Sequence, residues 1–201
     1  MITTLIFDIG NVLADFIWEE YYRSFGFTEE ILDRLAKATV KDPMWNEYDR
    51  GVMTDEEVLQ GFIDNDPGIE REIRLTLKDV GAMVRRNDYA IPWIKELQGK
   101  GYRCLYLSNF SEKARKECAA SMDFLPYMDG GILSYQDKVI KPMPEIYQLL
   151  IDRYQLVPEE CVFMDDTLRN LEGAEKFGIH TIHFKNQAQA IEELRKLGVD
   201  A

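Results

Sequence analysis

Residues 3–12 read Thr-Thr-Leu-Ile-Phe-Asp-Ile-Gly-Asn-Val. The apolar run at the start of this stretch ends at the carboxylate of Asp8, and Gly10 follows two positions later. A short apolar run bounded by polar residues is typical of a buried parallel strand, because it is too short to form an independent helix. The same pattern recurs at residues 103–108, 161–165 and 179–184, and more weakly at 130–134. We therefore predict a parallel sheet whose first strand ends at Asp8.

Helical patterns lie between the predicted strands. They cover residues 89–100, 111–121, 144–154, 168–177 and 187–197. Pro144 suits the first turn of one helix, and Gly178 and Gly198 suit the positions that end two others. This alternation predicts an α/β fold, with a Rossmann-like parallel sheet core and helices on both faces.

Residues 14–87 interrupt the alternation. Their patterns are helical, at residues 16–25, 29–38, 55–62 and 69–80. Because an insertion of roughly seventy residues is too long for a simple crossover, we predict a helical cap subdomain at 14–87. The core domain then consists of residues 1–13 and 88–201. We expect most of the cap's aromatic residues to form its own core, with Trp45, Tyr48 and Arg50 as candidates for contact with a substrate.

Composition limits the classes of partner. The chain has 201 residues, 46% hydrophobic and 30% charged, and this is typical of an ordinary globular protein with one sizeable core. Its formal charge of −12 argues against nucleic acid or an anionic membrane surface as a partner, since both require a basic surface. A small phosphorylated metabolite remains compatible, because a metal and local cations can hold one phosphate.

We expect a cytoplasmic protein, as a monomer or homodimer. The first residues run directly into an apolar strand without a basic segment or cleavage site. Cys104, Cys118 and Cys161 are widely spaced and form no C-x-x-C pair, which argues against disulfides or a zinc site and favours buried thiols.

Polar groups follow three predicted strands. Asp8 ends the first, Ser108-Asn109 the second and Asp165-Asp166 the third. Ligands of open parallel sheets bind beyond the carboxyl ends of the strands, and oxygen donors of this kind suit Mg²⁺. An aspartate after a strand can also be a simple helix N-cap, but the joint occurrence of these groups favours a magnesium site.

The order of these motifs resembles the haloacid dehalogenase-like hydrolase superfamily, most of whose members are Mg²⁺-dependent phosphatases. The four motifs are Asp8 with Gly10, Ser108-Asn109, Lys141-Pro142, and Asp165-Asp166 with Asn170, so the resemblance covers nearly the whole chain. The first motif, Asp-x-Gly-Asn-Val, resembles that of an alpha-D-glucose-1-phosphate phosphatase subgroup. The segment Asp49-Arg50-Gly51-x-x-Thr54 is similar to one in members that act on sugar phosphates.

The resemblance implies roles for these residues. Asp8 would be the nucleophile that forms an aspartyl-phosphate. Asp8, Asp166 and the Gly10 carbonyl would hold Mg²⁺, with Asp165 and Asn170 behind them, acting through water or by orienting the ligands. Ser108 and the Asn109 amide would donate hydrogen bonds to the phosphoryl group, and Lys141 would offset the negative charge. From the cap, Arg50 and Trp45 would contact the substrate.

Gly10 departs from the pattern of the superfamily. Most of its phosphatases have an aspartate there, which protonates the leaving oxygen and later activates water, a role worth about 10²–10⁴-fold. Three explanations are open: a leaving group that needs little protonation, a proton supplied by a cap residue or bound water, or low activity.

The sequence thus favours a Mg²⁺-dependent phosphohydrolase acting on a small metabolite such as a sugar phosphate. One alternative is a catalytically weak pseudoenzyme that binds phosphate ligands. Another is a 2-haloacid dehalogenase, although those relatives usually have tyrosine at the Gly10 position and no metal, so Asp165-Asp166 argues against it. In a phospho-accepting receiver domain the acid pair would precede the acceptor. His180 and His183, in or beside the last strand, are expected to be structural.

Overall fold

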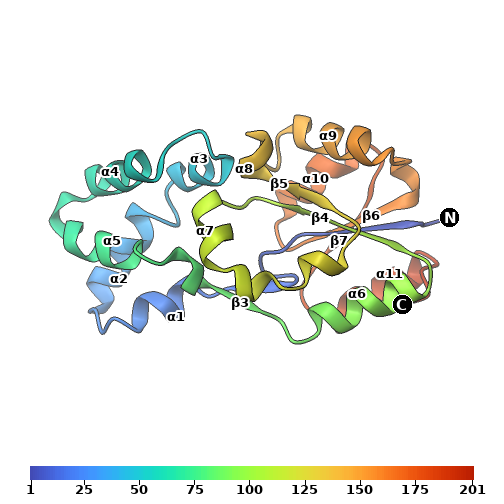
Figure 1. The fold of residues 1–201 in the computed structure, drawn as a ribbon, viewed down its shortest axis with the longest axis horizontal. Helices are drawn as coiled ribbons and strands as arrows, with labels where there is room; N and C mark the ends of the chain where they lie inside the picture. The colour runs from blue at the N-terminus through green and yellow to red at the C-terminus, as the bar shows by residue number, and fades with distance from the viewer.

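A parallel five-stranded sheet forms the core of the computed structural model, which describes residues 1–201 (Figure 1). The strand order is β5-β4-β1-β6-β7, and every neighbouring pair is parallel. The strands are β1 (Thr4–Phe7), β4 (Arg103–Ser108), β5 (Gly131–Leu133), β6 (Cys161–Asp165) and β7 (His180–His183). The predicted α/β fold is confirmed.

Strand β1 occupies the centre of the sheet, and all four of its residues are buried. Phe7, its last residue, pairs with Tyr106 of β4 and with Met164 of β6. The backbone amide of Asp8 then donates to the Met164 carbonyl at 2.9 Å. Asp8 therefore leaves the sheet at its carboxyl edge, between the ends of the two neighbouring strands.

Helices cover both faces of the sheet (Figure 1). Helices α6 (Ala90–Gly99) and α11 (Gln187–Lys196) pack on one face, in a cluster with Leu5 and Phe7. Helices α9 (Pro144–Tyr154) and α10 (Leu168–Glu175) pack on the other, in a cluster with Ile6. Two shorter helices, α7 (Glu112–Glu117) and α8 (Ser134–Asp137), follow β4 and β5 at the carboxyl edge.

Residues 17–83 form a helical subdomain beside that edge, with a hydrophobic core of its own. Its helices are α1 (Trp18–Arg23), α2 (Glu29–Ala38), α3 (Met44–Arg50), α4 (Asp55–Asn65) and α5 (Glu70–Thr76). Tyr22 and Phe62 are buried in its core. Tyr48, which the sequence offered as a candidate for substrate contact, is buried in the same core and does not line the cavity described below. The division of the chain at residues 13/14 and 87/88 stays a prediction.

A short antiparallel ribbon carries the chain into and out of the helical subdomain. It consists of β2 (Ala14–Phe16) and β3 (Val84–Arg86). Single 3₁₀ turns complete the fold, at Pro67–Ile69, Val80–Met83, Ala119–Met122, Leu125–Tyr127 and Pro158–Glu160. None of the helices combines the length and hydrophobicity that a membrane-spanning segment needs.

Three elements differ from the sequence prediction. The ribbon was not predicted, because strands of three residues are too short to show a two-residue period. Helix α3 was also missed, since its seven residues lack a side-chain N-cap. The helix expected over 111–121 ends at Glu117 and continues only as a 3₁₀ turn.

Two glycine substitutions test the packing of the helices. A Cβ added at Gly173 of α10 would lie 2.7 Å from the Tyr147 hydroxyl, and Tyr147 is fully buried. Gly173→Ala is expected to lower the free energy of unfolding by about 1–3 kcal/mol because the buried ring must shift. Gly99→Ala, in α6 with open space around it, should instead raise it by about 0.5–1 kcal/mol. Urea denaturation of both variants measures the difference, and equal effects would contradict the packing described.

Candidate active site

Three carboxylates meet at the carboxyl edge of the sheet. Asp8 follows β1, Asp165 ends β6 and Asp166 comes next, and one oxygen of each lies within 4.8 Å of the others. Because β1 and β6 are neighbouring parallel strands, their ends converge at one place. The structure thus brings Asp8 together with two adjacent acids, Asp165 and Asp166, that lie at least 157 residues later in the sequence.

Lys141 is buried among these carboxylates. Its Nζ lies 2.9 Å from Asp8 Oδ1 and 2.6 Å from Asp165 Oδ2, and its side chain is 1% exposed. Burial alone would lower the pKa of Lys141, but the charges of Asp165 and Asp8 outweigh it and raise that pKa above the ordinary value. The ammonium group therefore stays charged.

Asp8 sits in a strongly desolvated position. Burial, the largest effect, and the charge of Asp165 together raise its pKa to about 7, although the charge of Lys141 opposes them. Both Lys141 Nζ and the Ile9 amide, at 2.7 Å, bind the same oxygen, Oδ1. These two donors fix the orientation of the carboxylate.

The donor set fits Mg²⁺. Three carboxylates face one ammonium group, so the cluster has an excess of negative charge, and a divalent cation bound by a few carboxylate and carbonyl oxygens would balance it. The backbone of Gly10 lies beside them in the wall of the same cavity.

Asp165 is fully buried and fully engaged. Besides Lys141, its carboxylate accepts hydrogen bonds from the Thr167 amide at 2.7 Å and from Asn170 Nδ2 at 3.1 Å. Asp165 therefore orients the Lys141 ammonium group toward Asp8, and the hydrogen bonds from Asn170 orient Asp165 in turn.

The side chain of Asn109 positions Lys141. Its Nδ2 donates to the Lys141 carbonyl at 3.0 Å and its Oδ1 accepts from the Lys141 amide at 2.7 Å, beside the cis Lys141-Pro142 bond. From the sequence, only the backbone amide of Asn109 was expected to have a role. Ser108 is buried at the end of β4, next to this pair.

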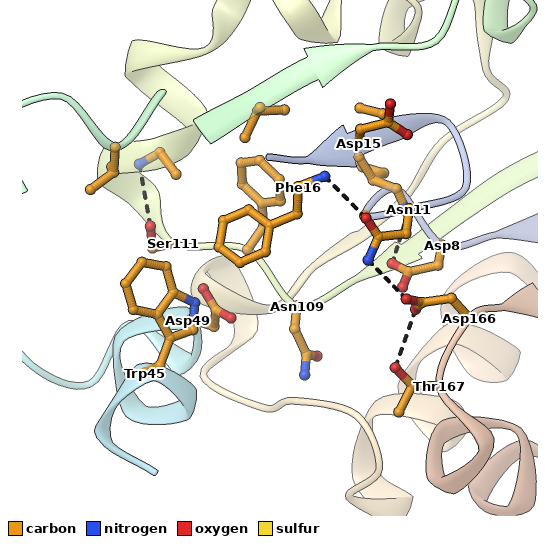
Figure 2. A pocket seen from close by; sticks show the side chains of 17 residues that line it. Asp8, Asn11, Asp15, Phe16, Trp45, Asp49, Asn109, Ser111, Asp166 and Thr167 are labelled. Atoms are coloured by element: carbon orange, nitrogen blue, oxygen red, sulfur yellow. Dashed lines mark hydrogen bonds between the residues drawn. The ribbon is translucent and has the colours of Figure 1, made fainter. Parts of the chain in front are cut away.

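Asn11 was missed in the sequence analysis. Its Nδ2 donates to Asp166 Oδ2 at 2.8 Å, and its Oδ1 accepts from the Phe16 amide at 3.1 Å (Figure 2). Asn11 has φ 55°, a left-handed conformation that asparagine tolerates better than most residues. An asparagine directly after Gly10 was thus a usable sequence signal for a sharp turn that returns a side chain to the site.

A cavity of about 190 Å³ opens in front of the carboxylates. Asp8, Asp166 and Asn109 line it from the core, whereas Trp45 and Asp49 line it from α3 and Phe16 from β2 (Figure 2). The outer wall is mostly apolar, formed by Phe16, Trp45, Val80, Val84 and Ala114.

Arg50 does not line this cavity. Its Nε donates to the Lys138 carbonyl at 2.9 Å and its Nη1 to Glu47 at 3.4 Å. Arg50 was expected to contact the substrate, but its guanidinium joins α3 to the end of α8 instead. The neighbouring Asp49, for which no role was predicted, does line the cavity.

Both histidines have structural partners. His183 Nε2 lies 2.9 Å from the Asp166 carbonyl, and His180 Nε2 lies 3.2 Å from the Glu159 carbonyl. The structural role expected for both histidines stays a prediction.

Comparison with known proteins identifies the family. A family model described as haloacid dehalogenase-like hydrolase matches residues 2–178. The chain belongs to the haloacid dehalogenase-like hydrolases. It is 35% identical over 105 residues to bifunctional epoxide hydrolase 2 from Mus musculus, which covers 50% of this chain and 19% of that protein. The chain spans only 10% to 19% of the length of the first curated relatives it matches.

Two other proteins match over most of their length. The phosphorylated carbohydrates phosphatase of Thermotoga maritima is 24% identical over 202 residues, or 94% of this chain and 89% of that protein. The crystal structure of a family enzyme from Bacteroides thetaiotaomicron, in complex with magnesium and inorganic phosphate, superposes with a TM-score of 0.70. It is 22% identical and the match covers 92% of this chain and 95% of that one, so it supports the fold.

Removal of the Lys141 ammonium tests the charge balance of the site. Lys141→Met leaves Asp8 and Asp165 buried without a counter-charge, which should lower the free energy of unfolding by about 3–5 kcal/mol. Lys37→Met is the matched control, because Lys37 pairs with Asp33 on the surface of α2 and is 71% exposed. Its cost should stay below about 0.5 kcal/mol. Urea denaturation without added metal measures both, and a similar small cost for the two variants would contradict the role given to Lys141.

Proposed function

We propose that this haloacid dehalogenase-like protein is a Mg²⁺-dependent phosphohydrolase that acts on a small phosphorylated metabolite through an aspartyl-phosphate on Asp8. The observation that carries the proposal is the Asp8 carboxylate, which faces the cavity while Lys141 binds it at 2.9 Å and Asp166 lies beside it. Cytoplasmic location and a monomeric or dimeric state are part of the same proposal.

The metal would be held by the Asp8 and Asp166 carboxylates and the Gly10 carbonyl. When bound, Mg²⁺ supplies positive charge to the phosphoryl oxygens and to the excess of carboxylates. Asn11 and Thr167 orient Asp166 for this task, through hydrogen bonds of 2.8 Å and 3.2 Å to its two oxygens.

Asp8 performs the displacement. Its carboxylate attacks phosphorus, the bond to the leaving oxygen breaks, and water then cleaves the aspartyl-phosphate, so that one difficult step becomes two easier ones. Lys141 and the Ile9 amide keep the carboxylate in one orientation, which favours in-line attack. Ser108 and the Asn109 amide would donate hydrogen bonds to the phosphoryl oxygens, where negative charge develops.

A sugar phosphate is the substrate class that we favour. Trp45 and Phe16, with ring centroids 5.9 Å apart, form an aromatic wall at the outer part of the cavity. Aromatic rings offer large flat surfaces of the kind that can cover the apolar face of a sugar. The Asp-x-Gly-Asn-Val motif and the named activity of the Thermotoga maritima relative support the same class.

One observation favours a second candidate. Gly10 has no side chain, and an added Cβ would meet nothing within 4 Å, so the space directly beside Gly10 is open. A protein that binds phosphate ligands with little turnover would fit this feature. A 2-haloacid dehalogenase is less well supported, since the cluster of three carboxylates suits a metal-dependent reaction.

A substrate screen tests the proposal. Purified protein with Mg²⁺ and a panel of phosphometabolites should release phosphate, and chelation of the metal should stop the release. Asp8→Asn should lower kcat by more than about 10³-fold, because the nucleophile is lost. Asp33→Asn, at an exposed surface pair, is the control and should leave kcat unchanged.

Two results would count against this function. Absence of phosphate release from every substrate, together with binding of Mg²⁺ and orthovanadate, would support the binding role. Undiminished activity in Asp8→Asn would show that Asp8 is not the nucleophile.

A further inference from the structure

Asp49 is an acid that the helical subdomain places in the cavity. It lies on α3 beside Trp45, on the side of the cavity opposite Asp8 and Asp166 (Figure 2). The family motifs at the carboxyl edge of the sheet do not include it, and the function proposed above assigns it no role.

The carboxylate of Asp49 has no partner in the protein. No hydrogen bond or ion pair reaches either of its oxygens, although it lines the same cavity as other acids. Two of those acids accept hydrogen bonds: Asp166 from Asn11 and Thr167, and Asp15 from Asn87 Nδ2 at 3.1 Å. Asp49 is thus a carboxyl group left available for a ligand in the cavity.

The environment of Asp49 favours the protonated carboxyl group. Burial raises its pKa to about 8, the nearby charge of Asp8 adds to this effect, and the charge of Lys141 opposes it. A carboxyl group whose pKa is raised in this way is suited to give a proton to a developing alkoxide.

Three hydrogen bonds attach the end of α3, which carries Asp49, to the segment that follows β5. The Ser134 hydroxyl, directly after β5, donates to the Asp49 carbonyl at 2.5 Å. Arg50 Nε donates to the Lys138 carbonyl at 2.9 Å, and Lys138 Nζ donates to the Gly51 carbonyl at 2.6 Å. Helix α3 ends there at Gly51, which has φ 70°. The acid therefore sits at a fixed place although it comes from the subdomain.

We propose that Asp49 is the catalytic general acid and base of this site and takes the place of the side chain that Gly10 lacks. This inference rests on the proposed phosphohydrolase function. Of the three explanations for the missing acid at Gly10, it favours the one in which the helical subdomain supplies the proton.

The proton balance of both steps can be written for Asp49. As Asp8 bonds to phosphorus, the bond between phosphorus and the leaving oxygen breaks, its electron pair stays on that oxygen, and the Asp49 proton moves to it. The Asp49 carboxylate then accepts a proton from water as the water oxygen bonds to phosphorus. The bond to Asp8 breaks, its electron pair returns to the Asp8 carboxylate, and the net reaction consumes one water.

A leaving-group series tests this role. The probes are 4-nitrophenyl, phenyl and 2-phenylethyl phosphate, whose leaving groups need increasing protonation while their size is similar. The quantity measured is kcat/KM with Mg²⁺, because it reports the steps up to loss of the leaving group. Asp49→Asn should lower it by about 10²-fold or more for 2-phenylethyl phosphate and by less than about 10-fold for 4-nitrophenyl phosphate.

Two further variants make the result specific. Glu47→Gln changes another carboxylate of α3 that does not line the cavity, and it should leave the ratio between the three substrates unchanged. Adding Gly10→Asp to the Asp49→Asn variant should raise its kcat/KM for 2-phenylethyl phosphate by about 10-fold or more, since the space beside Gly10 is open.

The outcomes separate this inference from the proposed function. Equal loss on all three probes in Asp49→Asn, unrestored by Gly10→Asp, would overturn the general-acid role while leaving the phosphohydrolase function intact. Unchanged activity in Asp49→Asn would overturn it as well. If the wild-type protein hydrolyses none of the probes or phosphometabolites, the proposed function fails and this inference fails with it.

Discussion

The buried contact of Lys141 with Asp8 and Asp165 is the interaction on which the site depends. Two carboxylates at such short range repel each other strongly in a desolvated place, and the ammonium between them, 2.9 Å and 2.6 Å away, makes their proximity possible. Asn109 fixes the Lys141 backbone, and Asn170 fixes Asp165. Since Asp166 adds a third carboxylate, the cluster stays negative and is suited to a cation and a phosphoryl group.

The second half of the site comes from the helical subdomain. Helix α3 brings Trp45 and Asp49 to the cavity, and hydrogen bonds to Ser134 and Lys138 attach its last turn to the end of β5 and to α8. A substrate would therefore lie between a rigid sheet edge that supplies the charged chemistry and a helix that supplies shape and one further acid. In the proposed function, the sheet edge would set the reaction type and the helical subdomain would select the leaving group.

The sheet and its charged residues could be predicted from the sequence because strand ends are local features. Asp8, Ser108-Asn109 and Asp165-Asp166 each follow an apolar run, and parallel pairing brings such ends together. The positions of Asp49 and Arg50 could not be predicted, because adjacent residues on one helix turn point in different directions and the docking of α3 on α8 decides which of them reaches the cavity. Asn11 was missed for a related reason, since its role depends on a left-handed turn.

The most direct measurement of the central claim is the site of phosphorylation. Protein mixed with Mg²⁺ and 4-nitrophenyl phosphate, quenched in acid within a single turnover and digested, can be mapped by mass spectrometry of its peptides. An aspartyl-phosphate mechanism predicts one phosphoryl group on the peptide that carries Asp8, and none in Asp8→Asn. Phosphate release without a phosphorylated peptide, or a phosphoryl group on any residue other than Asp8, would contradict it.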